Sequence, residues 1–249
     1  MSITVLQEAI RQKKTPIALG LMPELSKIPE KILKNFEEMF GPGAMANAEA
    51  LRYHGTQLLD TVADKLPAVM IHGGSYLRLG MMGMDVLWNL ISAAKSKGLY
   101  VILGVGTGEP AMWWDCGADA VTVNPYFGGD VCAVPEGKAV FAQVRTCNPS
   151  ATQVQTMMAG DRPLYAAVAE QMARNGAGLA IGTGYSLDIK DIRKRCEKAF
   201  LLLPNCDGAN AVPAFDDYGH GAMVVDFSLQ YGGDVDEAIR AMKEWVSVV

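Results

Sequence analysis

The chain has 249 residues, of which 22 are Lys or Arg and 27 are Asp or Glu, so its formal net charge is -5 and its pI is about 5.3. This acidic balance, without a cluster of basic residues and interleaved aromatics, argues against a nucleic-acid partner. The five cysteines form no CxxC pair, which argues against a disulfide framework or a structural zinc site. No apolar signal-like stretch opens the chain and no run approaches membrane-spanning length, so we expect a cytoplasmic protein without a membrane partner.

Eight apolar runs follow one another along the chain, each rich in Val, Ile, Leu or Ala and most ending in Gly, Pro or Asn. They are apolar throughout rather than alternating, which is typical of parallel strands covered by helices on both faces of a sheet. The runs are 16–23 (PIALGLMP), 67–74 (PAVMIHGG), 99–108 (LYVILGVGTG), 119–126 (DAVTVNPY), 139–149 (AVFAQVRTCNP), 178–184 (GLAIGTG), 199–208 (AFLLLPNCDG) and 221–228 (GAMVVDFS).

Helical patterns lie between these runs. Residues 82–98 place apolar side chains three and four apart and end in Lys and Gly, and residues 234–249 repeat this spacing after an acidic first turn. Residues 148–158 and 185–196 begin with polar capping residues. Eight alternations of strand and helix predict one TIM (β/α)8 barrel domain over residues 1–249, with a doubly wound open sheet as the alternative.

Charged side chains near the strand ends are the first candidates for catalysis, because the loops that follow the strands form the active face of such a barrel. His72 is a candidate general base, or a hydrogen-bonded packing residue. Glu109, Asp207 and Asp226 are candidate acid/base groups, or ordinary loop carboxylates. No HxE or ExxH spacing joins them, so we expect no bound metal.

Further polar residues follow other strands. Arg145 and Cys147 are two apart and are expected to share a strand face, where Arg145 would orient an anionic group. Cys147 would contact substrate, act as a nucleophile if Arg145 or His72 lowered its pKa or, as most free cysteines do, pack in the core. Thr183 and Tyr185 follow the sixth run. The GVGTG stretch at 104–108 lacks the G-x-G-x-x-G dinucleotide pattern, so we expect no cofactor.

Four segments together suggest a family: GLMPEL at 20–25, ADAVTVNPYFGG at 118–129, CNPSATQVQ at 147–155 and LLLPNCDG at 201–208. In order and spacing they resemble the longer bacterial branch of the orotidine 5'-phosphate decarboxylase family. This resemblance implies a TIM barrel and a homodimer whose two active sites lie at the subunit interface. It also implies substrate-binding roles for Asn124, Tyr126 and Asn148.

The family's charged catalytic residues are not found at the matching positions. Met22 stands where the family has an aspartate after the first strand, and Met70 or a neighbour replaces the lysine that ends the second strand. At the third strand, the family's D-x-K-x-x-D pattern is represented by Gly104, Gly106 and Glu109. The resemblance therefore implies that the proton-donating lysine is absent.

The family's phosphate-binding positions also differ. Residues 204–211 replace the P-G-x-G-x-Q-G-G pattern and place Ala209 at the expected glutamine, and residues 224–233 contain no arginine. Cys147 stands where the family's T-S-N-P has its pyrimidine-reading serine. The small and apolar replacements predict a roomier and less polar pocket.

These departures leave several functions open. The chain is interpreted as a repurposed lyase or isomerase for a small metabolite, nucleoside-like or anionic, with His72 and Glu109 as the acid/base pair. The alternative is a non-catalytic subunit that binds a ligand or assembles with an active partner as a hetero-oligomer. A third interpretation keeps authentic orotidylate decarboxylation in pyrimidine biosynthesis.

Overall fold

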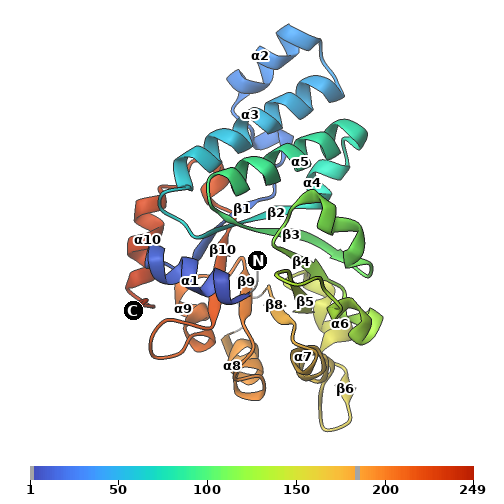
Figure 1. Ribbon diagram of the computed structural model, residues 1–249, viewed down its shortest axis with the longest axis vertical. Helices are drawn as coiled ribbons and strands as arrows, with labels where there is room; N and C mark the ends of the chain where they lie inside the picture. Colours follow the sequence, from blue (N-terminus) through green and yellow to red (C-terminus); the bar gives the residue numbers. More distant parts are fainter. Residues whose placement is uncertain (1–2, 183–185) are drawn as a thin grey trace.

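A computed structural model describes residues 3–182 and 186–249, and its centre is a closed barrel of eight parallel strands (Figure 1). Around the barrel the strands follow the order β1-β10-β9-β8-β5-β4-β3-β2. The strands are β1 (Ile17–Leu21), β2 (Ala68–His72), β3 (Tyr100–Thr107), β4 (Ala120–Val123), β5 (Ala139–Arg145), β8 (Gly178–Ile181), β9 (Leu201–Pro204) and β10 (Ala222–Asp226). Each lies within one of the eight apolar runs, so the prediction of a TIM barrel is confirmed and the open sheet is wrong.

Helices surround this barrel (Figure 1). The α-helices are α1 (Ile3–Lys13), α2 (Glu30–Phe40), α3 (Ala44–Val62), α4 (Gly73–Leu77), α5 (Gly80–Ser96), α6 (Thr152–Gln155), α7 (Leu164–Arg174), α8 (Ser186–Arg195), α9 (Gly208–Ala211) and α10 (Val235–Lys243). The 3-10 helices are η1 (Leu25–Lys27), η2 (Pro110–Cys116), η3 (Pro125–Cys132), η4 (Pro149–Ala151), η5 (Val212–Ala214) and η6 (Leu229–Tyr231). After β3 and β4, the 3-10 helices η2 and η3 replace α-helices. Strands β6 (Met158–Ala159) and β7 (Arg162–Pro163) form a separate antiparallel hairpin.

The final helix is shorter than its apolar spacing predicts. It ends at Lys243 because the chain then turns away, so that Val246 becomes buried and the N–H of Val249 donates to the carbonyl of Tyr218 at 3.2 Å. Within the described residues, no helix is long and apolar enough to cross a membrane.

The apolar core has two layers, one inside the barrel and one between the strands and the helices. The inner layer, which includes Met70, Ile102 and Phe141, fills the barrel, and Leu6 and Ile10 of α1 belong to the same cluster. The outer layer lies between the strands and the surrounding helices. Because strand ends project beyond this packing, the loops after the strands are where polar groups can meet.

Candidate functional site

The barrel strands carry very little charge at the mouth. Their only formally charged residues are Arg145 and Asp226, each the last residue of its strand, and none of the described barrel strands contains a lysine. Lysine and carboxylate pairs do occur elsewhere, as between Lys95 and Asp119 and between Lys27 and Glu24, but these lysines lie on helices. The interior of the mouth is therefore lined mainly by uncharged side chains.

His72 ends β2 and pairs in register with Gly104 of β3. Its half-buried ring places Nδ1 3.2 Å from the Ser75 hydroxyl oxygen, and Nε2 has no hydrogen-bond partner among the described residues. Burial lowers the pKa of His72 from its usual value of 6.5, so the ring is neutral at pH 7. A cavity of about 270 Å³ lies beside it, lined also by Met112 and Trp113. A neutral imidazole held through one nitrogen can accept a proton at the other.

Neighbouring side chains occupy the space around the mouth glycines. A Cβ atom on Gly104 would lie 2.8 Å from the Met70 methyl, and one on Gly106 would lie 2.5 Å from Oε1 of Gln143. Gly106 also has a φ of 56°, which a side chain tolerates poorly. The ends of Met70 and Gln143 therefore lie where side chains at these glycines would be, and the cavity of about 270 Å³ beside His72 is lined by Gly104.

The three predicted catalytic carboxylates have different surroundings. Asp207 is exposed and caps α9, accepting from the N–H of Asn210 at 2.8 Å. Asp226 accepts from the N–H and the hydroxyl of Ser228 at 2.8 and 2.6 Å. Glu109 is exposed at the start of η2, and its carboxylate has no partner among the described residues. The cavity beside His72 is not lined by Glu109, so the structure does not bring the predicted acid/base pair together there.

Arg145 is buried, with 3% of its surface exposed, and points towards the helices outside β5. Its Nε donates to Asp188 of α8 at 2.8 Å, its Nη1 donates to Gln155 of α6 at 3.1 Å, and its guanidinium lies 5.8 Å from the Tyr165 ring centroid. Cys147 is exposed beyond the end of the strand. The strand ends at Arg145, so the alternation that would place the two side chains on one face does not extend to Cys147.

The loop after β5 is held by a single glutamine. Oε1 of Gln155 accepts from the Thr146 N–H at 3.0 Å, and its Nε2 donates to the Thr146 hydroxyl at 2.7 Å. That hydroxyl in turn donates to Oδ1 of Asn148 at 2.6 Å. Asn148 is therefore exposed but oriented by the loop, and this position alone does not test its predicted contact with substrate.

Uncharged polar groups gather in a cavity of about 180 Å³ at the ends of β4 and β5. The predicted residues Asn124 and Tyr126 line it with Gln143, Thr146 and Gln155, while Leu164 and Val168 supply an apolar wall. Oδ1 of Asn124 is already used by the N–H of Tyr126 at 3.0 Å. We did not predict Gln143 or Gln155 from the sequence, because an isolated glutamine carries no motif and only the fold brings these two together.

Two other cavities lie at the barrel, one at each end. One of about 160 Å³, lined by Asp207, Asp226 and Trp245, lies between β9, β10 and α10. A larger cavity of about 620 Å³ is lined by residues that precede β8, β9 and β10, and so lies at the opposite end from the mouth. No group of three or more potential metal ligands occurs within the described part of the chain, and Thr183 and Tyr185 lie outside the described residues.

The chain is similar in sequence to several proteins named orotidine 5'-phosphate decarboxylase. The chain is 28% identical over 250 residues to the Roseiflexus sp. orotidine 5'-phosphate decarboxylase. This alignment covers 93% of the present chain and 78% of the relative. It is 27% identical over 244 residues to that of Clostridium novyi, covering 85% and 82%. Searched against protein-family models, the chain matches none.

Solved structures show the same architecture. The orotidine 5'-monophosphate decarboxylase of Plasmodium berghei superimposes with a TM-score of 0.82 at 13% identity and covers 98% of this chain and 96% of its own. The Leishmania donovani OMP decarboxylase gives a TM-score of 0.75 at 23% identity, with 96% and 95% covered. These structures establish the barrel fold, and over most of its length the chain is similar in sequence to orotidine 5'-phosphate decarboxylases.

Proposed function

We propose that this chain, a distant member of the orotidine 5'-phosphate decarboxylase family by sequence similarity, is a repurposed lyase or isomerase that acts on a small metabolite at the barrel mouth. The observation that carries the proposal is the absence of lysine from the described barrel strands, together with the engagement of Arg145 and Asp226 by protein groups. Ordinary orotidylate decarboxylation is not part of this proposal.

The rate that an enzyme loses without its charged catalytic groups supports this proposal. Decarboxylation leaves negative charge on carbon, and preorganised charges and donors that stabilise such charge usually make the largest catalytic contribution. Removing one donor costs roughly 100-fold to 1,000-fold in rate. The family resemblance implies that Met70 and Gly106 replace two of the charged groups, so the proposal combines two such losses.

His72 is proposed as the proton-transfer group, because its ring is neutral, half-buried, held by Ser75 and beside a cavity. Glu109, at the end of the next strand, is proposed as the second acid/base group. The amides of the cavity at β4 and β5 favour an uncharged polar portion of the ligand, such as a ring with carbonyl and N–H groups. Asn148 and Cys147 would contact the ligand from the loop after β5.

A second function is favoured by the packing of the mouth. Met70, Gln143 and Phe227 occupy the space above three glycines, which leaves small cavities rather than one open site. This packing supports a non-catalytic subunit that binds a ligand or assembles with an active partner. A homodimer with shared sites remains part of the first proposal, and native mass spectrometry distinguishes it from a hetero-oligomer.

Three measurements separate these functions. Incubation of orotidylate with the pure protein should give no turnover above background, and rapid turnover would establish authentic decarboxylation instead. Melting with nucleosides, nucleotides and small acids should identify a stabilising ligand. Chemistry on that ligand should then be lost in His72→Gln and Glu109→Gln, whereas activity that survives both changes would remove the proposed pair. A ligand that binds without turnover would favour the non-catalytic subunit.

A further inference from the structure

A cavity of about 620 Å³ lies at the end of the barrel opposite the mouth. The ends of α7 and α8 form its sides, the loop 196–200 and Gly221 lead from it into β9 and β10, and Ile3 and Gln7 of α1 also line it. Its volume falls within the usual range for small-molecule sites, about 300–1,000 Å³. Since it lies where strands begin, it is separate from the candidate site.

Cationic side chains outnumber carboxylates around this cavity, although the whole chain has a net charge of -5. Arg174, Lys194, Arg195 and Lys198 line it, with Glu170 and Glu197 as the acidic residues. Both lysines are exposed, and neither ammonium group has a hydrogen-bond or ion-pair partner within residues 3–182 and 186–249. An anion entering the cavity would therefore meet cations whose charge is not already paired.

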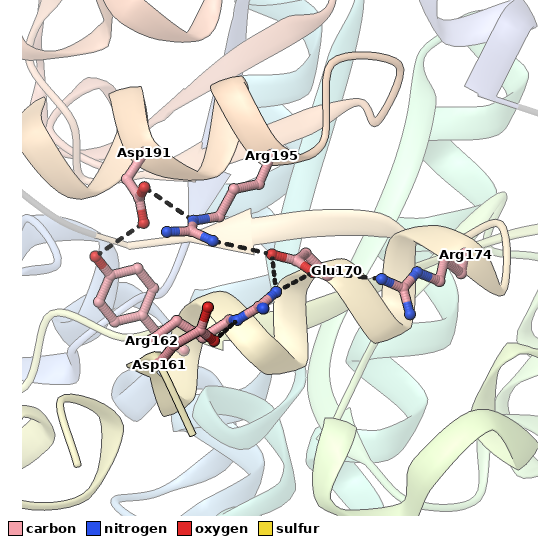
Figure 2. A network of polar contacts seen from close by, with 7 residues as sticks. Asp161, Arg162, Glu170, Arg174, Asp191 and Arg195 are labelled. Carbon is pink, nitrogen blue, oxygen red and sulfur yellow. Dashed lines mark hydrogen bonds and ion pairs between the residues drawn. The ribbon is translucent and has the colours of Figure 1, made fainter. Parts of the chain in front are cut away.

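Arg174 and Arg195, which line the cavity, share the carboxylate of Glu170 with Arg162, which does not line it (Figure 2). Glu170 accepts from Nη1 of Arg162 at 2.6 and 2.8 Å, from Nη1 of Arg195 at 3.1 Å and from Nη2 of Arg174 at 3.4 Å. Nε of Arg195 also donates to Asp191 at 2.9 Å. This network fixes the guanidinium of Arg195, while Nη2 of Arg195 has no hydrogen bond to the described residues. A fixed guanidinium with free N–H donors suits an oxyanion.

A second observation concerns the wall of the cavity. The C-terminal end of α8 points there, and the partial negative charge of a helix end would repel an anion. Arg193, in the last turn of α8, lies beside this end, and it neutralises main-chain carbonyls that follow the helix: its Nη1 donates to those of Glu197 and Ala199 at 2.9 and 2.8 Å, and its Nη2 donates to that of Gly221 at 2.8 Å. Its hydrogen bonds within the described chain all go to main-chain carbonyls. The carbonyls are satisfied and a positive charge stands behind them.

We propose that this cavity binds the phosphate groups of a phosphorylated small metabolite, with Lys194, Arg195 and Lys198 as the principal anion contacts. The apolar side chains of Ile3 and Phe200 at the same cavity suit the uncharged body of such a molecule. A nucleic-acid strand fits less well, because the chain as a whole is acidic and would repel a long polyanion. The proposal does not depend on the function proposed for the mouth.

Titration calorimetry of the full chain with inorganic pyrophosphate and with UMP tests this site. The double variant Lys194→Glu and Lys198→Glu should weaken pyrophosphate binding by about 100-fold, because each charge-assisted contact typically contributes about 10-fold and the variant removes two. Lys190→Glu makes the same Lys-to-Glu replacement once, on an exposed residue of α8 that does not line the cavity, so it is the control for each single replacement and should change affinity less than about twofold.

The affinities of the variants show whether the anion binds in this cavity. Binding that weakens with rising salt, is lost in the double variant and persists in Lys190→Glu and His72→Gln supports the site. Absence of binding in the wild-type protein, or equal affinity in all variants, overturns it. Binding of UMP that is lost in His72→Gln but kept in the double variant assigns the phosphate to the mouth instead. Binding of single-stranded RNA without pyrophosphate binding also overturns the proposal, because it indicates a nucleic-acid surface. Melting of each variant checks that it folds.

Discussion

The filling of the mouth by Met70 can be tested with a double-mutant cycle. In Gly104→Ala, the new Cβ would lie 2.8 Å from the Met70 methyl, which must move by roughly 0.6 Å to reach an ordinary 3.4 Å contact. Such overpacking typically costs about 1–3 kcal/mol, offset by about 0.4–1 kcal/mol from the less flexible unfolded chain. We therefore expect a net loss of about 1 kcal/mol in the free energy of unfolding.

Met70→Ala should by itself cost about 2–5 kcal/mol, because the side chain is 5% exposed and leaves a cavity. In that background, Gly104→Ala should become neutral or stabilising, which gives a coupling energy of about 1 kcal/mol or more. Urea unfolding of the four proteins measures it. Met81→Ala, at an exposed position, is the control and should show no coupling to Gly104→Ala. Additivity within about 0.5 kcal/mol would refute the inference that Met70 occupies the space beside Gly104.

Three further outcomes follow from the site. Burial lowers the pKa of His72, so the unfolded chain binds more protons below about pH 6.5 and this residue's contribution to stability should fall as pH falls through that range; an NMR titration midpoint at or above 6.5 would contradict the assignment. Asp188→Asn should lower the free energy of unfolding by about 3 kcal/mol because it leaves the buried Arg145 without its carboxylate, as urea unfolding will show; a loss below about 1 kcal/mol would mean that other groups hold the guanidinium. Asp207→Ala should lower the free energy of unfolding in urea by about 1 kcal/mol, because the N–H of Asn210 at the start of α9 loses its capping carboxylate. Loss of ligand turnover without loss of stability would instead indicate a catalytic role for Asp207.

The strands were predictable from the sequence because their apolarity is continuous, and this pattern survives any local irregularity. The positions of individual side chains were less so. Arg145 was assigned to the face of Cys147 by counting residues along an ideal strand, but β5 ends at Arg145, so the count does not reach Cys147. Nothing in the local sequence marks this end, because it depends on the pairing of β5 with β8, in which Arg145 and Ile181 are the last pair.

The surroundings of the strand-end carboxylates show a different limit. An Asp at the start of a helix is a recognisable capping signal, and Asp207 before Gly208–Ala211 fits it. That signal was outweighed by the position of Asp207 after a strand, where catalytic groups gather. Gln143 and Gln155 carried no signal at all, because their shared cavity exists only when β5 and α6 are folded against each other.

The same packing constrains which chemistry remains at the mouth. Groups that stabilise a developing charge must be held in place without partners that neutralise them, which is energetically costly in a protein interior. Here Arg145 is paired with Asp188, Asp226 is bonded to Ser228, and Met70 lies beside Gly104, so the interior resembles a relaxed core. The reaction proposed above is therefore one without a strongly charged intermediate. A neutral histidine beside a cavity suits a reaction that needs only modest proton transfer, and this is why His72, rather than any carboxylate, is the residue on which the catalytic proposal depends.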